Sequence, residues 1–400
     1  MSFKKSFDVN FILMLVVFFV TNDSFTFGTS ENTVIVNSTY LIYFTICSYI
    51  IVLRKSILLN RNSLLAIFFL SFCVLLVAVF NQDFTFGYGV QVLTILTAFL
   101  ISQHMNFKIF LLYFEKVLYF LCWVSLFFFI SFVIFPFLAS LLPVFQNSAG
   151  VSFVNLFVFA KMTDVERNIG IFREPGVFMI YINIGILIQL FVQQKIDIKK
   201  IIVYVTTLMT TLSTAGFLVF FLILIMYLFR SNTTTVFFKK ILYLSIAFLL
   251  VSPFLYLLAT SFEKLGDSDN VSLLSRLASV MIPMQMSYDA NFLGVGLTKF
   301  SIYFKILSKE IYSIEIESVG ASTNTTLNLL ATYGFLFCFV FLRGLYLFSK
   351  HISRGFMSSL IVLLIFILMI GNEDMRYSLL VLSIMFYGYN LSKPLKFDTK

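Results

Sequence analysis

The chain has 400 residues, of which 60% are hydrophobic and 12% are charged, and its net charge is +9. Soluble domains carry roughly 25% charged residues, and one water-soluble core could not bury this much apolar surface. The composition excludes an ordinary soluble enzyme, a disordered protein and a nucleic-acid-binding protein, and it indicates a polytopic, all-α membrane protein.

Apolar segments long enough to form membrane helices recur along the whole chain. The first follows Lys4 and Lys5, as in a signal sequence, but no small-residue cleavage site comes after it. We therefore expect an uncleaved first helix. The predicted spans are 9–27, 34–53, 63–80, 84–102, 110–135, 176–194, 241–259, 324–342, 356–371 and 377–391.

The stretch 201–229 is too long for one span and short for two. Its middle, from Thr210 to Gly216, is a break of small and polar residues. If two short helices meet there, most of the 28 basic residues fall on the cytoplasmic side and most of the 19 acids fall outside, as the positive-inside rule requires. We therefore predict a single transmembrane domain over 1–400, with about twelve helices and both termini in the cytoplasm.

This topology leaves two long external loops, 136–175 and 260–323. Long loops in a compact protein are usually functional or disordered. The second contains an amphipathic stretch near 276–286, which predicts a helix on the membrane surface. The only two histidines, His104 and His351, fall on the cytoplasmic side, so external carboxylates are the candidate general bases.

Cysteine spacing and charge placement narrow the function further. Cys47, Cys73, Cys122 and Cys338 lie in apolar runs without CxxC spacing, so we expect packing residues and neither a disulfide nor a metal site. No P-loop or acidic metal cluster is present in the sequence, and we expect no cofactor. Inside the predicted spans the charges are nearly confined to 115–116, which argues against an ion-coupled transporter.

The end of the first long loop, residues 166–176, carries Arg167 and Arg173 directly before a membrane span. Guanidinium groups suit a diphosphate because they donate two parallel hydrogen bonds and stay charged. The alternative is an interfacial anchor, in which the arginines reach lipid headgroups and Pro175 begins the next helix. The spacing alone does not favour either interpretation.

The second long loop offers Arg276 as its candidate, because no other basic residue lies between Lys264 and Lys299. Gly294 and Gly296 follow in the same loop. They could form a turn that lets the backbone approach a ligand, or a simple loop bend. The pattern favours the bend.

Four stretches of the sequence, in order, carry a family resemblance. They are Arg167 to Pro175, similar to R-x-x-G-x-F-x-E-P; Thr210 to Gly216, similar to a break between two short helices; Ser275-Arg276 with Phe292 to Gly296, similar to S-R…G-V-G; and Ser322 to Gly334, similar to H-N-x-x-L…G. In this order they resemble stretches of the bacterial O-antigen polymerases. The related O-antigen ligases have a histidine where this chain has Thr323, which favours polymerase over ligase.

The resemblance implies a metal-independent, GT-C-like glycosyltransferase of the bacterial inner membrane that needs no cofactor. It would join oligosaccharide repeat units carried on undecaprenyl diphosphate into O-antigen or a similar surface polysaccharide at the periplasmic face. A chain-length regulator protein is an expected partner, besides membrane lipid. The alternatives are an O-antigen ligase and, in another functional class, a polysaccharide flippase or other transporter.

Site residues follow from the same resemblance. Arg173 and Arg276 would bind and stabilise the departing diphosphate, with Arg167 in support, because fixed guanidinium groups act most strongly near low-dielectric lipid. Glu174 would activate the acceptor hydroxyl or, equally, orient Arg173. The predicted catalytic residues are thus Arg173, Arg276 and Glu174, and the predicted substrate-binding residues are Arg167, Gly170 and Asn324.

Overall fold

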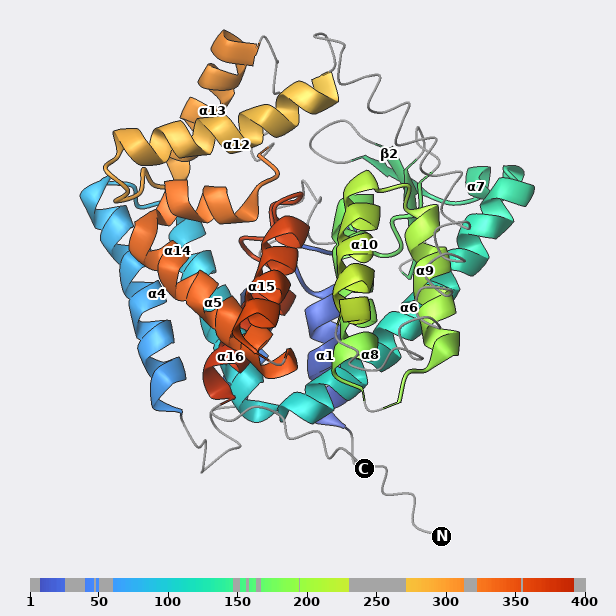
Figure 1. Cartoon of the computed structure of the whole chain (residues 1–400). Helices are drawn as coiled ribbons and strands as arrows, with labels where there is room; N and C mark the ends of the chain where they lie inside the picture. The colour runs from blue at the N-terminus through green and yellow to red at the C-terminus, as the bar shows by residue number, and fades with distance from the viewer. Residues whose placement is uncertain are drawn as a thin grey trace.

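The computed structural model describes residues 8–25, 40–46, 48–49, 60–146, 152–155, 158–162, 167–193, 195–229, 271–312, 322–353 and 355–391. This part of the chain is mostly helical (Figure 1). Its bundle is made of α1 (Val9–Phe19), α4 (Arg61–Phe80), α5 (Phe86–His104), α6 (Phe107–Ile134), α8 (Pro175–Phe191), α9 (Ile198–Thr210), α10 (Thr214–Phe229), α14 (Thr325–Ile352), α15 (Phe356–Ile370) and α16 (Leu379–Asn390).

The bundle helices form two groups that meet at its centre. On one side α14 packs against α4, α15 and α16, and α5 packs against α4 and α16. On the other side α8 packs against α6, α9 and α10. Contacts of α10 with α15, and of α1 with α6 and α16, join the two groups into one body (Figure 1).

Two further helices and a small sheet lie at one end of the bundle. The helix α12 (Val271–Asp289) runs across this end and packs against α13 (Leu297–Tyr312) and α14 (Figure 1). A short helix α7 (Phe137–Ser140) precedes the antiparallel sheet β1-β2-β3, with strands Val144–Gln146, Ser152–Asn155 and Ala160–Met162. Sequence periodicity did not predict this sheet, because its strands have only three or four residues.

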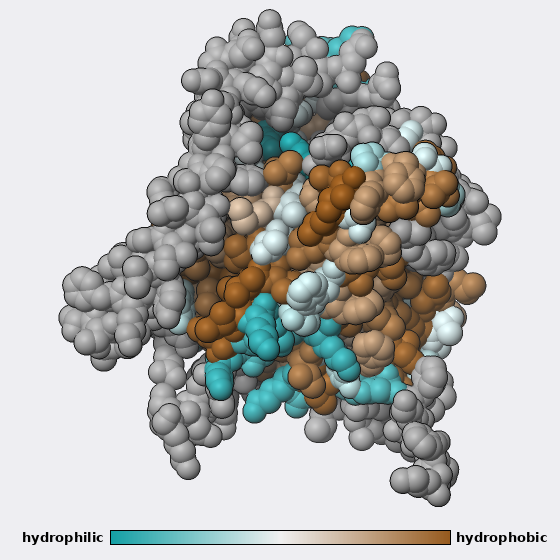
Figure 2. Space-filling model, turned by 90° about the vertical axis from the view of Figure 1, so that its right-hand side faces the viewer, coloured by the Kyte–Doolittle hydropathy of each residue, from teal (hydrophilic) through white to brown (hydrophobic). Residues whose placement is uncertain are grey.

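The surface of the bundle is apolar over most of its height. Four helices (α4, α5, α6 and α14) are long and apolar enough to cross a membrane, and five further apolar helices are shorter. Large side chains such as Phe68 and Phe72 on α4, and Phe120 and Phe127 on α6, are exposed. In Figure 2 a broad apolar belt covers the face at the right of Figure 1, with hydrophilic residues below it. Exposed apolar area of this extent marks a surface that lipid covers, so the chain is a helical membrane protein.

The predicted break in 201–229 is confirmed as a helix break. The helix α9 ends at Thr210 and α10 begins at Thr214, with Leu212 between them at a φ of 50°. The Ser213 hydroxyl accepts a hydrogen bond from the Gly216 amide at 3.2 Å, as a residue at a helix start does. The number of membrane spans stays a prediction.

The other predicted elements match the structure where it describes them. The amphipathic stretch near 276–286 lies within α12, a helix as expected. The first helix is shorter than predicted, because the chain turns at 20–25 to pair with 171–173. The predicted span 241–259 and most of 34–53 lie outside the described residues, and so does Cys47. The remaining three cysteines are buried and free, as expected.

The turn at 290–296 is bound to a kink in α14. The amides of Val295 and Gly296 donate to the carbonyls of Ala331 (2.8 Å) and Thr332 (3.1 Å). Gly334, at a φ of 85°, interrupts the helix there, and a Cβ on it would lie 2.7 Å from the Leu293 carbonyl oxygen. The glycines of this turn therefore allow a close approach of its backbone to α14.

The acid Glu115, at the other end of the bundle, is paired within the protein. Glu115 on α6 is buried and accepts hydrogen bonds from Gln189 (2.6 Å) and Gln193 (3.0 Å) and an ion pair from Lys200 (3.0 Å). The last turns of α5 and α14 carry the two histidines. The intramembrane charge at 115 is thus satisfied and serves to hold α6, α8 and α9 together.

Candidate functional site

A cluster of charged side chains lies where the end of α1, the start of α8 and the turn between α15 and α16 meet. Its members come from distant parts of the sequence, and Arg173 interacts electrostatically with four carboxyl groups. We call this group the charged cluster. It consists of Asp23, Arg173, Glu174, Glu373, Asp374 and Arg376.

The segment before α8 is held in place by the chain that leaves α1. The Phe25 amide donates to the Ile171 carbonyl (2.8 Å), and the Arg173 amide donates to the Asp23 carbonyl (3.1 Å). A hydrogen-bonded pair of this kind fixes the backbone on both sides of residue 172. The backbone of Arg173 is therefore held in place by these hydrogen bonds, independently of the contacts of its side chain.

Gly170 and Phe172 shape the turn that leads to Arg173. Gly170 has a φ of +57°, and a Cβ on it would lie 2.9 Å from the Phe178 ring. Phe172 is buried, with ring centroids 5.1 Å from Phe178 and 4.3 Å from Tyr181. The G-x-F part of the pattern thus forms a packed turn, and Gly170, which we predicted to bind substrate, is buried beneath Phe178.

Asn168 joins two of the stretches that carry the family resemblance. Its Nδ2 donates to the hydroxyls of Thr210 (2.9 Å) and Ser125 (3.2 Å), and its amide donates to the Thr210 carbonyl (2.9 Å). Its Oδ1 accepts from the Gly170 amide at 3.0 Å. The start of the stretch from Arg167 to Pro175 is therefore hydrogen-bonded to the break between α9 and α10. Sequence reasoning did not predict this contact.

The Arg173 guanidinium is anchored on one side only. Its Nη2 donates to the Asp374 carbonyl at 2.6 Å, while its buried Nε has no hydrogen-bond partner among the described residues. Burial lowers the pKa of Arg173, but Glu174, Glu373, Asp374 and Asp23 outweigh that effect and raise it. Arg173 therefore keeps its charge with part of its donor capacity unused.

Glu174 and Glu373 form a carboxyl pair beside this arginine. Glu373 is buried, with 7% of its side chain exposed, and shares a hydrogen bond with the exposed Glu174. Burial, followed by the charge of Glu174, raises the pKa of Glu373 well above its ordinary value. Because burial and a nearby like charge both disfavour the charged form of a carboxyl group, the protonated form of Glu373 is favoured over a wider pH range than in a solvated glutamate.

The glycine at the start of α8 makes room for this pair. A Cβ on Gly176 would overlap the Glu373 carboxyl group. Pro175 occupies the first turn of α8, with Glu174 as the N-cap residue. The E-P-G sequence therefore places one carboxyl at the helix start and leaves space for a second, which comes from the α15–α16 turn.

Asp374 and Arg376 tie the α15–α16 turn to the neighbouring helices. Arg376 donates to both Asp374 oxygens, from Nε (2.9 Å) and from Nη2 (2.7 Å). Its Nη1 donates to the Thr332 hydroxyl (3.2 Å), and its guanidinium lies 5.1 Å from the centre of the Phe300 ring. This forked geometry is the strong form of ion pair, and it holds α13 and α14 against the cluster.

Asp23 is the most buried carboxylate of the charged cluster. It accepts hydrogen bonds from Tyr181 (2.8 Å) and Ser378 (2.5 Å) through one oxygen, and its Oδ1 has no partner among the described residues. Burial raises the pKa of Asp23, although Ser378 and Arg173 act in the opposite direction. Two of the four carboxyl groups in the cluster, Asp23 and Glu373, therefore have a raised pKa.

Asn324, a predicted substrate-binding residue, begins α14 beside the same turn. Its Oδ1 accepts from the Leu327 amide at 3.1 Å and caps the helix. The hydroxyl of the next residue, Thr325, donates to the Glu373 carbonyl (2.5 Å) and accepts from the Met375 amide (2.7 Å). The structure thus brings Asn324 next to the turn that carries Glu373.

Arg276 and Arg167 stand apart from the hydrogen-bonded cluster. Both are exposed, and no hydrogen bond or ion pair joins them to Arg173 in the part of the chain that the structure describes. Arg276 lies on α12 one turn before Ser279, whose hydroxyl accepts from the Thr323 amide at 3.1 Å. The helix that carries Arg276 is therefore docked on the segment that carries Asn324, while Arg276 itself is exposed.

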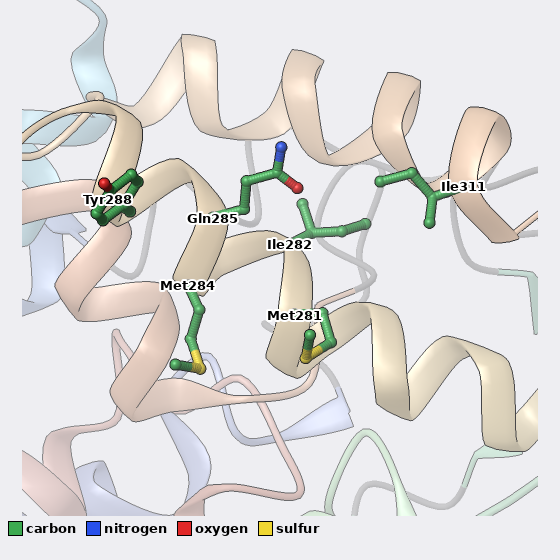
Figure 3. A pocket seen from close by; sticks show the side chains of 6 residues that line it. All are labelled: Met281, Ile282, Met284, Gln285, Tyr288 and Ile311. Atoms are coloured by element: carbon green, nitrogen blue, oxygen red, sulfur yellow. The ribbon is translucent and has the colours of Figure 1, made fainter.

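Residues of α12 help to line two pockets. One, of about 410 Å³, lies between α12 and α13, where Gln285 points from α12 toward α13 and Ile311 faces it (Figure 3). Its lining is mostly apolar and includes Met281, Met284 and Tyr288. The other, of about 460 Å³, mixes apolar groups with Asn81, Gln285, Asp289, Lys299 and Tyr303.

Sequence reasoning missed Asp23, Glu373, Asp374 and Arg376. One signal was available: residues 372–377 place three charges in a short connection between two apolar helices, in a chain that is only 12% charged. Among the described residues, no group of three or more His, Cys, Asp or Glu side chains is placed to hold a metal ion. The cluster therefore has arginine and carboxyl chemistry to offer.

The fold and the charged cluster define a helical membrane protein with ionisable groups gathered at one end of its helix bundle. No protein-family model matches the chain, and neither the curated proteins nor the solved structures contain a match.

Proposed function

We propose that this protein is a membrane glycosyltransferase that polymerises oligosaccharide repeat units carried on a polyprenyl diphosphate. The observation that carries the proposal is the position of Arg173 beside the Glu174–Glu373 pair. A fixed guanidinium stabilises charge on a departing phosphate, and an exposed carboxylate takes a proton from an acceptor hydroxyl. The sequence resemblance of residues 167–175 to O-antigen polymerases supports the same reaction.

In this reaction the acceptor sugar hydroxyl attacks the anomeric carbon of the growing chain. The new glycosidic C–O bond forms as the bond between that carbon and the lipid diphosphate oxygen breaks. Glu174 accepts the hydroxyl proton, and Arg173 stabilises the charge that the diphosphate carries away. Glu373, whose pKa is raised by its burial and by the neighbouring Glu174, hydrogen-bonds to Glu174 and so positions that carboxyl group beside Arg173.

The proposal extends to topology and cellular setting. We propose about twelve spans in a GT-C-like arrangement, termini in the cytoplasm, and the charged cluster at the periplasmic face of a bacterial inner membrane. Support comes from the two ends of the bundle, since α12, α13 and the cluster lie at one end and Lys200, with both histidines, at the other. The substrate would be an undecaprenyl-diphosphate-linked oligosaccharide, with a chain-length regulator as partner and neither metal nor cofactor.

A proton-coupled polysaccharide transporter is the second candidate. Asp23, a buried carboxyl group with one unpartnered oxygen and a raised pKa, favours it, because transporters use such groups to carry protons. The O-antigen ligase alternative has less support, since Thr323 replaces the histidine of that branch.

A deletion strain of the source organism distinguishes these functions. Its surface polysaccharide is resolved on a gel after complementation with the wild-type chain, Arg173→Ala, or the exposed control Lys195→Ala. A polymerase predicts a single-repeat glycolipid in the deletion and in Arg173→Ala, and a full ladder with Lys195→Ala. No attached repeat at all indicates a ligase, and lipid-linked repeats trapped in the cytoplasmic leaflet indicate a transporter.

A further inference from the structure

An apolar groove lies between α4 and the kink of α14. It has a volume of about 630 Å³, within the roughly 300–1,000 Å³ typical of ligand pockets. Its floor is made of buried side chains and its rim of exposed apolar ones. The floor residues are Cys73, Val77 and Tyr333, and the rim residues are Phe72, Leu293, Phe335 and Leu336.

The groove opens on the flank of two membrane helices. Both α4 and α14 are long and apolar enough to span a membrane, and Phe72 and Phe335 on its rim are exposed. Hydrocarbon, and not water, is the solvent at such a surface. An open apolar groove at this position suits a hydrocarbon chain better than a polar ligand.

The origin of the groove is the interruption of α14 at Gly334. The Phe335 amide donates to the Phe292 carbonyl (2.8 Å) and not to its own helix, so the turn at 290–296 inserts beside the kink. This turn has an apolar side, with Phe292 and Leu293 in the groove. Its other side belongs to the pocket that contains Asp289 and Lys299.

The inner wall of the groove reaches the charged cluster. The Tyr333 hydroxyl donates to Gln91 Oε1 at 3.4 Å, and it also hydrogen-bonds to Tyr377 and feels the charge of Arg376. Residue 332, its neighbour, accepts a hydrogen bond from Arg376. The apolar groove on the lipid-facing surface and the charged cluster therefore lie on either side of Tyr333 and Thr332. A lipid with a hydrocarbon chain and a charged head has the same two parts.

We propose that this groove binds the polyprenyl chain of the lipid-linked substrate and directs its diphosphate toward the charged cluster. This assignment rests on the proposed function, because that function supplies the polyprenyl lipid. A chain in the groove would place the lipid against α4 and α14, with its head beneath α12. The groove would then determine which class of lipid carrier the protein accepts.

Photolabelling of the full-length protein in lipid nanodiscs tests the groove without any turnover. The probe is a polyprenyl phosphate with a diazirine near the end of its chain, and the labelled sites are read by peptide mass spectrometry. We expect adducts within 72–77 and 333–336, reduced at least fivefold by excess unlabelled polyprenyl phosphate and not by phosphatidylcholine. Adducts spread evenly over the exposed faces of α4 and α6, or equal competition by phosphatidylcholine, would overturn the assignment.

Two tryptophan variants and a matched control complete the test. Leu336→Trp fills the groove from its rim, where the side chain is 47% exposed, and Leu76→Trp fills it from α4. Leu75→Trp changes the adjacent α4 position, which is 54% exposed and lies outside the groove lining. We expect labelling to fall at least fivefold in the first two and to stay unchanged in Leu75→Trp. Unchanged labelling in Leu336→Trp would contradict the groove assignment.

Arg173→Ala separates this inference from the proposed function. It removes the proposed diphosphate contact and leaves the groove lining intact, so labelling persists while polymer synthesis is lost. Polymer synthesis by Arg173→Ala would refute the proposed function. The photolabelling result would still show whether the groove binds a polyprenyl chain.

Discussion

The buried carboxyl of Glu373 and the exposed carboxyl of Glu174 share a hydrogen bond beside Arg173. The two residues are about 200 positions apart in the sequence. The pair exists because Gly176 leaves space at the start of α8 and because the α15–α16 turn brings Glu373 into that space. The raised pKa of Glu373, in a carboxyl pair next to a guanidinium, makes the arrangement sensitive to pH.

Glu373→Gln tests the proton on Glu373. The folded protein raises the pKa of Glu373 above its ordinary value of 4.5, so stability from this group is fully present below that value. It is lost as the pH rises from about 4.5 toward the raised pKa. Glutamine keeps a hydrogen-bond donor to Glu174 and does not titrate. We expect the thermal midpoint of Glu373→Gln, measured in detergent from pH 4 to 9, to fall less with pH than that of the wild type.

The exposed acid Glu310 supplies the control for this pH series. Glu310→Gln should reproduce the wild-type profile, because that side chain is solvated. Parallel profiles for Glu373→Gln and the wild type would show that Glu373 has no raised pKa.

Gly176→Ala tests the close approach of the two segments. The added Cβ overlaps the Glu373 carboxyl and must displace the α15–α16 turn, at a cost of about 1–3 kcal/mol. The matched variant Gly89→Ala adds a Cβ with nothing within 4 Å. We expect a lower thermal midpoint and a lost polymer ladder for Gly176→Ala alone. Equal behaviour of the two variants would refute the tight contact.

Arg376→Ala tests the fork between Arg376 and Asp374. Removing one partner leaves a partly buried carboxylate without its cation, which destabilises proteins by about 3–5 kcal/mol. Asp374→Asn combined with Arg376→Ala removes that unpaired charge, so the double variant should be more stable than Arg376→Ala. Denaturant unfolding of the wild type, Arg376→Ala, Asp374→Asn and the double variant measures the coupling free energy between the two side chains. Strict additivity would mean that the ion pair contributes nothing.

Arg173→Lys tests whether the fork geometry of Arg173 matters, or only its charge. Lysine keeps the charge but cannot donate to Asp374 and to a phosphate in the same plane. By analogy with the loss of one oxyanion-hole donor, we expect the rate of polymer formation to fall about 10²–10³-fold. The rate is measured by pulse labelling of surface polysaccharide. A wild-type rate would show that any cation suffices.

The helices were predictable because each is a continuous run of apolar residues, and the length of such a run can be read directly from the sequence. The spans that became α4, α5, α6 and α8 begin and end within a few residues of their predictions. The break at 210–216 was predictable as well, because small polar residues interrupt an apolar run. The end of α1 was not, since it depends on pairing with 171–173 far along the chain.

The charged cluster was only half predictable. Arg173 and Glu174 stand in a recognisable pattern, whereas Asp23 is a single acid after an apolar helix and Glu373 lies in a short charged connection without a known pattern. Their importance comes from tertiary contacts that sequence spacing does not encode. The packing of Gly294 was not predictable either, because its close neighbour is the backbone of α14, which lies about 40 positions further along the chain.

The most direct measurement is a transfer reaction with the purified chain in lipid nanodiscs. The substrate is a repeat-unit oligosaccharide on undecaprenyl diphosphate, and the products are separated by chromatography. We predict oligomers of two or more repeats with one released lipid diphosphate per bond formed, lost in Arg173→Ala and retained in Lys195→Ala. Undiminished oligomer formation by Arg173→Ala, or no oligomers from the wild-type chain, would contradict the account.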